Sequence, residues 1–348
     1  MKIKSLSVER FRQFKETKFE VSDINILVGP NNSGKTSILH ALRAFFFLLK
    51  GYVNIEGNPP KATYHKRFIS TVEELVPTPD TRELWYQRQA SNTTPIKISV
   101  EFNDGAKFTL QLRYQFGQVH ASIENLQSNL SSEEIKEYFD QEVVYIPGLV
   151  GVLVKESYAT AARRNSLAAQ GRYSEIFRSS LMQLKNRDTA LLTNINVHLE
   201  KLFGITVSDV AFNETTDEFV TVKYRQSGKD YDVVSSGSGL QQVIQMLAYL
   251  YLSKPSVLLI DEPDAHLHSR LQGALGKLLR EVAIDLKTQL FLSTHSVDLI
   301  DTFNPEEVII VDASKKSVKP LGANRELVSS LVDAGIVDIS AFSRLLAS

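Results

Sequence analysis

The segment INILVGPNNSGKT, residues 24–36, decides the fold of this chain. Its first five residues form a short apolar run that ends at Gly29, which is typical of a buried strand. From Lys35 to Leu49 the apolar residues recur at helical spacing and would lie on one face of a helix. A strand, a glycine-containing loop and a helix follow one another, which indicates an α/β fold with parallel strands.

The loop between this strand and this helix matches the pattern G-x-x-x-x-G-K-[ST]. Its glycines let backbone N–H groups curl around phosphate oxygens, and the helix that follows points its positive end at them. Lys35 would reach the outer phosphates, and Thr36 would offer its hydroxyl to Mg²⁺. ATP and Mg²⁺ are therefore the predicted cofactors. The predicted nucleotide-binding residues are Gly29, Pro30, Asn31, Asn32, Ser33, Gly34, Lys35, Thr36 and Ser37.

The composition is that of an ordinary globular protein. The 348 residues include no cysteine, which excludes disulfides, thiolate metal sites and cysteine nucleophiles. The apolar runs are too short to span a membrane, and the N-terminus has no signal-peptide pattern, so we expect a cytoplasmic protein without a membrane partner. The formal net charge of −1 gives no overall attraction to nucleic acid, so such a contact would need a local basic patch.

Two carboxylates follow another apolar run, residues 257–260. A carboxylate at the end of a strand beside the phosphate loop can hold Mg²⁺ through water, which is the role expected of Asp261 together with Thr36. Glu262 comes next and is the candidate general base for the water that attacks the γ-phosphate. A further apolar strand, 289–292, leads to His295, and a parallel neighbour would bring this side chain to the same edge. The predicted catalytic residues are Lys35, Glu262 and His295.

A second glycine- and serine-rich segment precedes the predicted helix 239–252. Its small residues and N–H groups form another anion-binding helix start, and one phosphate loop does not need two. We therefore expect a head-to-tail homodimer, in which this segment of one subunit closes over the γ-phosphate held by the other. The alternative is a turn that only caps a core helix. The residues concerned are Ser236, Gly237, Ser238 and Gly239.

The rest of the chain predicts an antiparallel meander and a helical arm. Alternating patterns at 96–102, 107–116 and 119–123 are typical of paired strands, and the proline-containing stretch 54–93 is expected to be irregular. Residues 131–139 and 158–203 are rich in helix formers and predict the arm, with interruptions near Gly171 and Asn186.

The arm contains a local excess of basic residues, six against one acidic residue within 163–187. Such a cluster is either a solvated helical face or a surface for DNA or an acidic protein partner. The basic residues are Arg163, Arg164, Arg172, Arg178, Lys185 and Arg187.

These four motifs in this order resemble those of the ATP-binding-cassette (ABC) class of P-loop ATPases. The opening LSVERFRQF, residues 6–14, followed by GPNNSGKT, is similar to the RecF, SMC and OLD branch, whose members act on DNA. The run DEPDAHLH, residues 261–268, is especially similar to OLD-type (overcoming lysogenization defect) ATPases, which are common in bacterial anti-phage systems. The resemblance implies an α/β ABC-type ATPase head with a mixed or parallel core sheet, an antiparallel meander and a short helical arm. A single domain over 1–348 would comprise an N-terminal lobe (1–130), the arm (131–204) and a C-terminal lobe (205–348).

The resemblance also implies roles for individual residues. Arg12 would contact the α-phosphate or the base region of the nucleotide, and the 261–268 run would continue into the loop that crosses the dimer interface. Zinc binding by His266 and His268 is the less favoured alternative, because two ligands lack further clustered partners. Gln141, before the predicted strand 143–146, is a weak candidate for the glutamine-loop residue of the class.

OLD-type proteins typically carry a Toprim nuclease domain after the ATPase. Residues 296–348 are too few for that domain and contain neither a Glu-Gly-x-x-Asp strand nor an Asp-x-Asp pair, so we expect no DNA cleavage by this chain. The end, Val328 to Leu346, resembles the linker that leads into Toprim in longer relatives.

Two classes of function remain open from the sequence. In the first, ATP hydrolysis opens and closes a homodimer or larger homo-oligomer that regulates a nuclease or other effector on DNA, in anti-phage defence or in DNA repair as in RecF and SMC proteins. In the second, the chain is a nucleotide-gated scaffold that assembles or sequesters a toxic partner with little turnover.

Overall fold

A six-stranded sheet lies at the centre of the molecule. The computed structural model describes residues 1–50, 53–56, 61–64, 67–69, 76, 78, 80–124, 134, 137–138, 140–148, 151–312 and 317–320. Across the sheet the order is β10 (Val143–Ile146), β14 (Val257–Asp261), β15 (Gln289–Thr294), β3 (Ile24–Val28), β16 (Val308–Asp312) and β17 (Ser317–Pro320). The first five strands are parallel, and β17 is antiparallel to β16. Strands β3, β14 and β15 are buried along their whole length, as in a sheet covered on both faces. The predicted α/β fold is confirmed.

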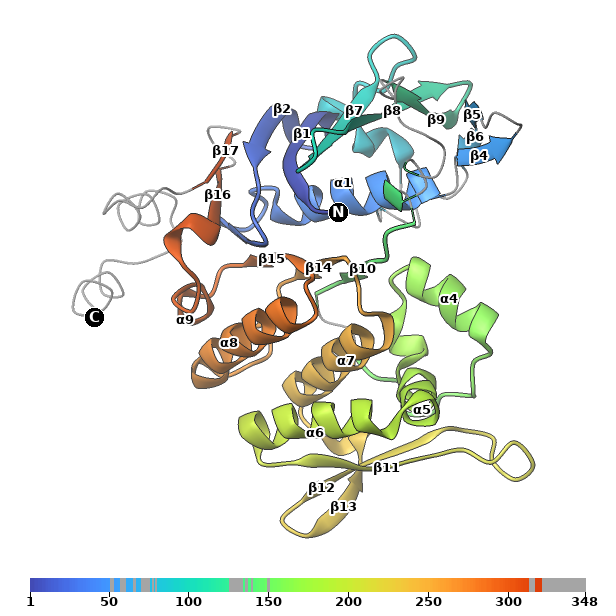
Figure 1. Cartoon of the computed structure of the whole chain (residues 1–348), viewed down its shortest axis with the longest axis vertical. Helices are drawn as coiled ribbons and strands as arrows, with labels where there is room; N and C mark the ends of the chain where they lie inside the picture. The colour runs from blue at the N-terminus through green and yellow to red at the C-terminus, as the bar shows by residue number, and fades with distance from the viewer. Residues whose placement is uncertain are drawn as a thin grey trace, which may run out of the picture.

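A second, antiparallel sheet packs over helix α1 (Lys35–Lys50), which lies between the two sheets (Figure 1). Phenylalanines of α1, Phe45 and Phe46, share one buried cluster with Phe102 and Phe108 of this sheet. The predicted meander is confirmed. The strand order is β2 (Phe14–Glu20), β1 (Ile3–Phe11), β7 (Ile96–Phe102), β8 (Lys107–Gln115), β9 (Gln118–Glu124) and β6 (Arg67–Ile69).

The stretch 54–93 is more regular than its sequence predicts. It contains most of β4 (Val53–Glu56), which pairs with β5 (Lys61–Tyr64), together with β6 and the 3₁₀ helices η1 (Thr81–Leu84) and η2 (Tyr86–Arg88). The prediction of irregular structure was wrong for these strands. The reason is that Pro59 and Pro60 fall between β4 and β5 in the sequence, where they remove no donor from either strand.

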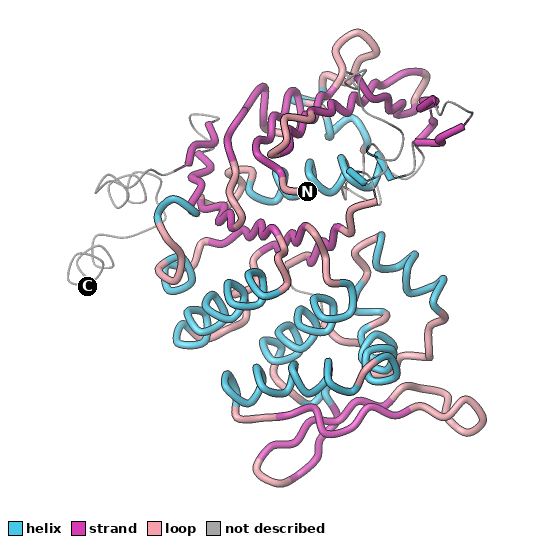
Figure 2. Tube along the Cα trace, in the orientation of Figure 1, coloured by secondary structure: helices cyan, strands magenta, loops and turns pink. Residues whose placement is uncertain are grey.

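Helices cover the other face of the central sheet (Figures 1 and 2). Helix α7 has apolar residues buried all along its length, because it lies between the central sheet and further helices. A small sheet of three antiparallel strands lies outermost. The helices are α4 (Ala161–Ala169), α5 (Phe177–Arg187), α6 (Thr189–Phe203), α7 (Ser238–Ser253), α8 (Ser269–Asp285) and α9 (Val297–Ile300), with 3₁₀ turns η3 (Tyr173–Glu175), η4 (Val233–Ser235) and η5 (Pro305–Glu307), and the outer strands are β11 (Thr206–Ala211), β12 (Thr221–Gln226) and β13 (Lys229–Asp232).

The helices predicted over 158–203 form, and they lie folded against the lobe instead of projecting from it. Leu181 and Leu184 of α5 and Leu199 of α6 belong to the same buried cluster as α7, which explains the packing. Within the described ranges, no helix combines the length and the apolar character that crossing a membrane would require. The predicted helix 131–139 falls largely outside the described residues, and the linker-like stretch 328–346 does so entirely.

Five of the six basic residues of the arm are buried or bonded within the fold, and Arg163 is exposed. Arg164 and Arg178 are buried, so they cannot contribute to a surface patch. Arg172 pairs with Glu175, Lys185 donates to a main-chain carbonyl at 2.7 Å, and Arg187 donates to another at 3.0 Å. Arg164 and Arg178 therefore drop out of the basic cluster, while Arg163 and Arg187 stay exposed, and the choice between a solvated face and a surface for DNA or an acidic partner remains open.

The ion pair between Arg178 and Asp232 joins α5 to the outer sheet. The Arg178 nitrogens donate to both carboxylate oxygens of Asp232, at 2.7 and 3.0 Å, and the Arg178 side chain is 2% exposed. Burial acts to raise the pKa of Asp232, but hydrogen bonds from Arg178 and from the Val234 N–H outweigh it and hold the pKa below its ordinary value. This stabilisation is present above the unfolded pKa of aspartate and is lost as the pH falls through the folded value.

We expect Asp232→Asn to lower the free energy of unfolding by about 2 to 3 kcal/mol, because the buried guanidinium loses its counter-charge while Asn keeps the N-cap of η4. Urea denaturation at neutral pH measures the change. The matched control is Asp230→Asn, which breaks the exposed pair with Arg225 and should cost less than about 1 kcal/mol. Equal losses for the two variants would contradict a special role for the buried pair.

Candidate nucleotide site

The phosphate loop joins β3 to α1 and contains a position that only glycine can occupy. Gly34 has a φ of +111°, and a Cβ atom there would lie 2.4 Å from the Phe14 ring. Asn32 also has a left-handed backbone, with φ 64°, which asparagine tolerates better than most residues. The loop is therefore curled by its own residues and by the neighbouring aromatic ring, in the manner that turns backbone N–H groups toward a bound phosphate.

Lys35 lies inside this loop. Its Nζ donates to the carbonyl oxygens of Gly29, at 2.7 Å, and Pro30, at 3.1 Å, and the side chain is 4% exposed. Burial lowers the pKa of Lys35, and the carboxylates of Glu262 and Asp261 act against this shift. A lysine ammonium so placed is the charge that suits the outer phosphates of a nucleotide.

Thr36 and Asp261 form the candidate magnesium pair. The Thr36 hydroxyl donates to the carboxylate of Asp261 at 2.9 to 3.0 Å, and the Ser293 hydroxyl donates to the same carboxylate. Burial raises the pKa of Asp261, while the hydrogen bonds from Ser293 and Thr36 favour its charged form. A hydroxyl and a carboxylate side by side are the hard oxygen donors that Mg²⁺ prefers, so the residues fit this ion.

The parallel pairing of β14 with β15 places the remaining candidates at the same edge. Asp261 is in register with Ser293, so Glu262 and His295 both emerge just past the ends of their strands. Glu262 has a left-handed backbone, with φ 43°, held by hydrogen bonds from its N–H to the carbonyl (3.0 Å) and hydroxyl (3.1 Å) of Ser293. Such a conformation costs about 1–3 kcal/mol and persists because its surroundings fix it.

The Glu262 carboxylate lies between a lysine and a histidine. Its Oε1 is 3.9 Å from Lys35 Nζ and 3.5 Å from His295 Nδ1. Glu262 is about one-third exposed and His295 about half exposed, so this end of the site faces solvent while Lys35 is buried. The structure therefore brings together Lys35, Thr36, Asp261, Glu262 and His295.

Hydroxyl groups at the end of β15 are functional candidates that the sequence motifs did not single out. Besides Ser293, Thr294 donates to the buried carboxylate of Asp264 at 2.9 Å, which ties the 262–268 loop to β15. Burial raises the pKa of Asp264, and the Thr294 hydrogen bond opposes the shift. The available signal was the strand register, which places each of these hydroxyls beside the carboxylate run.

Arg12 lies at the corner between β1 and β2, close to the phosphate loop. Its neighbour Gln13 accepts a hydrogen bond from the Ser37 hydroxyl at 3.0 Å, and Arg12 itself contacts the ring of His40 on α1, at 3.3 Å between Nη1 and Nδ1. The other ring nitrogen of His40 is 3.1 Å from the hydroxyl of Tyr145 on β10. Burial, with Arg12 and Arg43 adding to it, lowers the pKa of His40 to about 3, so the ring is neutral at physiological pH. The sequence did not predict that a neutral His40 connects Arg12 to Tyr145.

The serine–glycine segment 236–239 opens helix α7. Gly237 and Ser238 are exposed, and the Gln241 side chain holds the turn by donating to the carbonyl of Ser236 at 3.0 Å. A Cβ at Gly239 would lie 2.5 Å from the side chain of Leu267, so the 262–268 loop packs directly on the start of α7. Among the described residues, no hydrogen bond or ion pair joins this segment to the phosphate loop of the same chain.

Gln141 lies at the wrong end of its strand for a glutamine-loop residue. It precedes β10, whose Val143 pairs with Val257 at the start of β14, whereas the site lies beyond Asp261 at the other end. The residues that follow β10 are Pro147 and Gly148, and Gly148 passes close to the carbonyl of Asp261. The prediction was wrong because it considered closeness in sequence and ignored the direction of the strand.

The fold and this site define an ABC-type P-loop ATPase head, and comparisons with known proteins agree. The family model described as "AAA domain, putative AbiEii toxin, Type IV TA system" matches residues 24–301. This is well over half of the chain, and the chain belongs to this family.

The relatives include proteins of the predicted RecF, SMC and OLD branch, which is thereby confirmed. Endonuclease GajA of Bacillus cereus (strain VD045) is 24% identical over 367 residues, which cover 91% of this chain and 59% of GajA. The chain thus spans about three-fifths of that relative. DNA replication and repair protein RecF of Vibrio vulnificus (strain YJ016) is 31% identical over 105 residues, covering 28% of this chain and 27% of RecF.

Solved structures of SMC heads share the fold. The head domain with an extended coiled coil bound to the C-terminal domain of ScpA, derived from Pyrococcus furiosus, superposes with a TM-score of 0.57 at 12% identity, covering 95% of this chain and 98% of that one. The SMC head bound to the C-winged helix domain of ScpA gives 0.61 at 13% identity, with coverages of 94% and 99%. At this identity the likeness concerns the fold alone.

Proposed function

We propose that this chain binds ATP with Mg²⁺ and hydrolyses it, and that two copies form a head-to-tail dimer around the nucleotide. The observation that carries the proposal is the position of Glu262, whose carboxylate lies between Lys35 and His295 and beside the Thr36–Asp261 pair. A lysine of the phosphate loop without a nearby carboxylate would support nucleotide binding alone. A carboxylate without such a lysine would support only a structural role. The lysine and the carboxylate together at one edge of the sheet support a reaction at a phosphate group.

Each residue would have a distinct task. The loop N–H groups and Lys35 would hold the phosphates, and Thr36 and Asp261 would hold Mg²⁺, which neutralises phosphate charge when bound. Glu262 would take the proton from the attacking water, and its strained backbone fixes where the carboxylate lies. His295 would orient that carboxylate or donate to the γ-phosphate.

We expect Glu262→Gln to reduce ATP turnover at least about a hundredfold, because the amide cannot accept the proton, while ATP binding is retained. Phosphate release and light scattering after size exclusion measure the two effects, and an ATP-bound dimer should accumulate. Glu214→Gln, in an exposed turn, is the matched control and should behave as wild type. Normal turnover in Glu262→Gln would remove this residue as the base.

The dimer part of the proposal is supported by the exposed start of α7. Its N–H groups and the small residues 236–239 form an anion site that, among the described residues, is not bonded to the phosphate loop of its own chain. In a head-to-tail pair, this segment of one subunit would meet the γ-phosphate held by the other. Each site would then contain residues of both copies.

Mixing two inactive variants tests this sharing. Lys35→Ala disables the phosphate loop and Ser236→Arg blocks the trans segment, so each alone should lack turnover. An equimolar mixture should regain about a quarter of the wild-type rate, since half of the dimers are mixed and each has one intact site of two. Lys35→Ala mixed with Glu262→Gln is the control and should recover nothing, because both changes lie on the same side of the site. If the first mixture also stays inactive, the sites are not shared.

The output of this ATPase is proposed to be the control of a nuclease or toxic effector in anti-phage defence. The similarity to a protein named as an endonuclease, and a family description that names a toxin–antitoxin system, support this proposal. A protein partner is favoured over direct DNA binding, since five of the six basic arm residues are buried or bonded within the fold and Arg163 is the exposed exception. This favours regulation through protein contacts that follow dimer opening and closing.

We therefore expect linear duplex DNA alone to change the ATP turnover of the chain by less than about twofold at physiological salt. Steady-state phosphate release with and without DNA measures this, with the salt concentration varied because phosphate contacts weaken as salt rises. A several-fold, salt-sensitive stimulation would show instead that the chain acts on DNA directly. Negligible turnover in both cases, together with nucleotide-dependent binding of a partner protein, would favour the scaffold function.

A further inference from the structure

Arg12 lies beside the phosphate loop because the β1–β2 corner that carries it packs on that loop. The side chain of its neighbour Gln13 accepts a hydrogen bond from the Ser37 hydroxyl at 3.0 Å. The ring of Phe14 lies so close to Gly34 that a Cβ atom there would approach it to 2.4 Å. The corner is therefore fixed against the residues that would surround a nucleotide phosphate, and Arg12 is held at the edge of that site.

Helix α1 supplies a partner that holds the Arg12 side chain. Nη1 of Arg12 is 3.3 Å from Nδ1 of His40, which follows Thr36 by four residues in the helix. Residues at this spacing lie on one face of a helix, about one turn of 5.4 Å from each other. The contact therefore anchors one end of the Arg12 guanidinium about one helical turn beyond Thr36, the candidate magnesium ligand.

The two hydrogen-bond partners of His40 determine which ring nitrogen carries the proton. A guanidinium can only donate, so Nδ1 accepts from Arg12, and the neutral ring then carries its proton on Nε2. This Nε2 is 3.1 Å from the hydroxyl oxygen of Tyr145 and donates to it. His40 is 5% exposed and Tyr145 is 6% exposed, so water does not compete for their contact. The other tautomer of His40 would direct an N–H at the arginine, which disfavours it.

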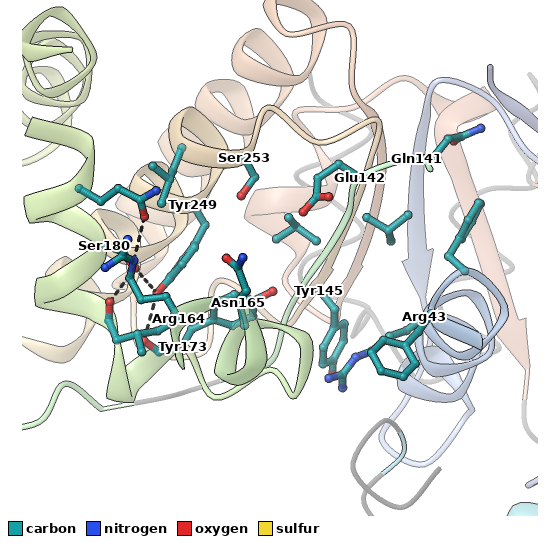
Figure 3. Close-up of a pocket in the computed structure, with 18 residues that line it drawn as sticks. Arg43, Gln141, Glu142, Tyr145, Arg164, Asn165, Tyr173, Ser180, Tyr249 and Ser253 are labelled. Carbon is teal, nitrogen blue, oxygen red and sulfur yellow. Dashed lines mark hydrogen bonds between the residues drawn. The ribbon is translucent and has the colours of Figure 1, made fainter. Parts of the chain in front are cut away.

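Tyr145 is held by several contacts and can fix the ring of His40. Its backbone is in register with Leu259 of β14, just before Asp261. The guanidinium of Arg43 lies 4.8 Å from the centre of the Tyr145 ring, and both side chains line a cavity of about 480 Å³ (Figure 3). The rings of His40 and Tyr145 meet edge-on, with their centroids 5.3 Å apart. The hydroxyl of Tyr145 is therefore a fixed acceptor for Nε2 of His40.

A neutral acceptor suits an arginine that has to meet a phosphate. A carboxylate in place of His40 would also orient the guanidinium, but its negative charge would compete with the phosphate. The neutral imidazole orients Arg12 and adds no such charge. A side chain that is already held in one conformation also loses less conformational freedom when a ligand binds.

We propose that His40 is a positioning residue of the nucleotide site. It holds the guanidinium of Arg12 for contact with the bound nucleotide, and Tyr145 fixes the orientation of the His40 ring. This inference rests on the proposed binding of a nucleotide at the phosphate loop. It adds two residues, one on α1 and one on β10, that act on the nucleotide through Arg12.

Isothermal titration calorimetry of the full chain with ADP and Mg²⁺ tests this proposal, because ADP binding requires neither hydrolysis nor a γ-phosphate that joins two subunits. Arg12→Ala and His40→Leu should each weaken ADP binding at least about tenfold, since a hydrogen bond of a charged group is lost. His40→Asn is the matched control, because asparagine has nearly the shape of leucine and its amide oxygen can still accept from Arg12. This variant should bind ADP within about threefold of the wild type.

Further variants test whether His40 acts through its two neighbours. In the Arg12→Ala background, His40→Leu should cause no further loss of affinity, because the side chain that it positions is absent. Tyr145→Phe, which removes only the hydroxyl, should weaken ADP binding about threefold. Thermal unfolding checks that each variant is folded.

The inference fails if Arg12→Ala or a folded His40→Leu binds ADP as the wild type does, or if His40→Asn loses as much affinity as His40→Leu. It also fails if the losses of Arg12→Ala and His40→Leu multiply in the double variant. An unchanged affinity in Tyr145→Phe would overturn the part assigned to that residue. Absence of ADP binding by the wild type would show instead that the proposed nucleotide site itself is wrong, and the inference with it.

Discussion

The parallel register of β3, β15 and β14 is the constraint on which the site depends. Because Asp261 pairs with Ser293, and Ser293 with Leu27, the ends of three strands far apart in sequence meet at one edge. The phosphate loop, the carboxylates and the histidine all follow those ends. A slip of one residue in any strand would point each side chain to the opposite face and separate the groups. The apolar residues that bury these strands on both faces therefore also specify the geometry of the charged groups.

Local sequence patterns were enough to predict the parts of this edge. The run 24–36 combines a strand, a curled loop and the start of a helix, and a few neighbouring residues are enough to predict each of them. What the sequence could not predict was which hydroxyls serve the carboxylates. Ser293 and Thr294 are separated from Asp261 and Asp264 by a whole helix, and only the strand pairing brings them into contact. The prediction for Gln141 was wrong for a related reason, since a residue near a strand can lie at either end of it. Likewise, the charge pattern of the arm did not reveal that Arg164 and Arg178 are buried.

The charged groups of the site are buried, and their neighbours neutralise their charges only in part. Burial raises the pKa values of Asp261 and Asp264 and lowers that of Lys35, so each group loses hydration that its neighbours only partly replace. Hydrogen bonds from Thr36 and Ser293 favour the ionised form of Asp261 and fix its direction. A pre-oriented, partly desolvated set of charges interacts more strongly with a multivalent phosphate than the same groups would in water. Burial also keeps His40 neutral beside Arg12. A protonated His40 would repel the arginine that it contacts.

The contact between Gly239 and Leu267 gives the proposed dimer a route between its two sites. The segment 236–239 would bind the nucleotide of the partner, while the 262–268 loop carries Glu262 and Asp264 of its own site. Only glycine at 239 allows these two pieces to touch, since a Cβ would overlap both Leu267 and the carbonyl of His266. If the α7 start shifts on meeting one phosphate, we expect the packed 262–268 loop to move with it, and this loop carries the proposed base for the other phosphate. Because packed elements of this kind adopt discrete arrangements, the two sites are expected to act together instead of independently.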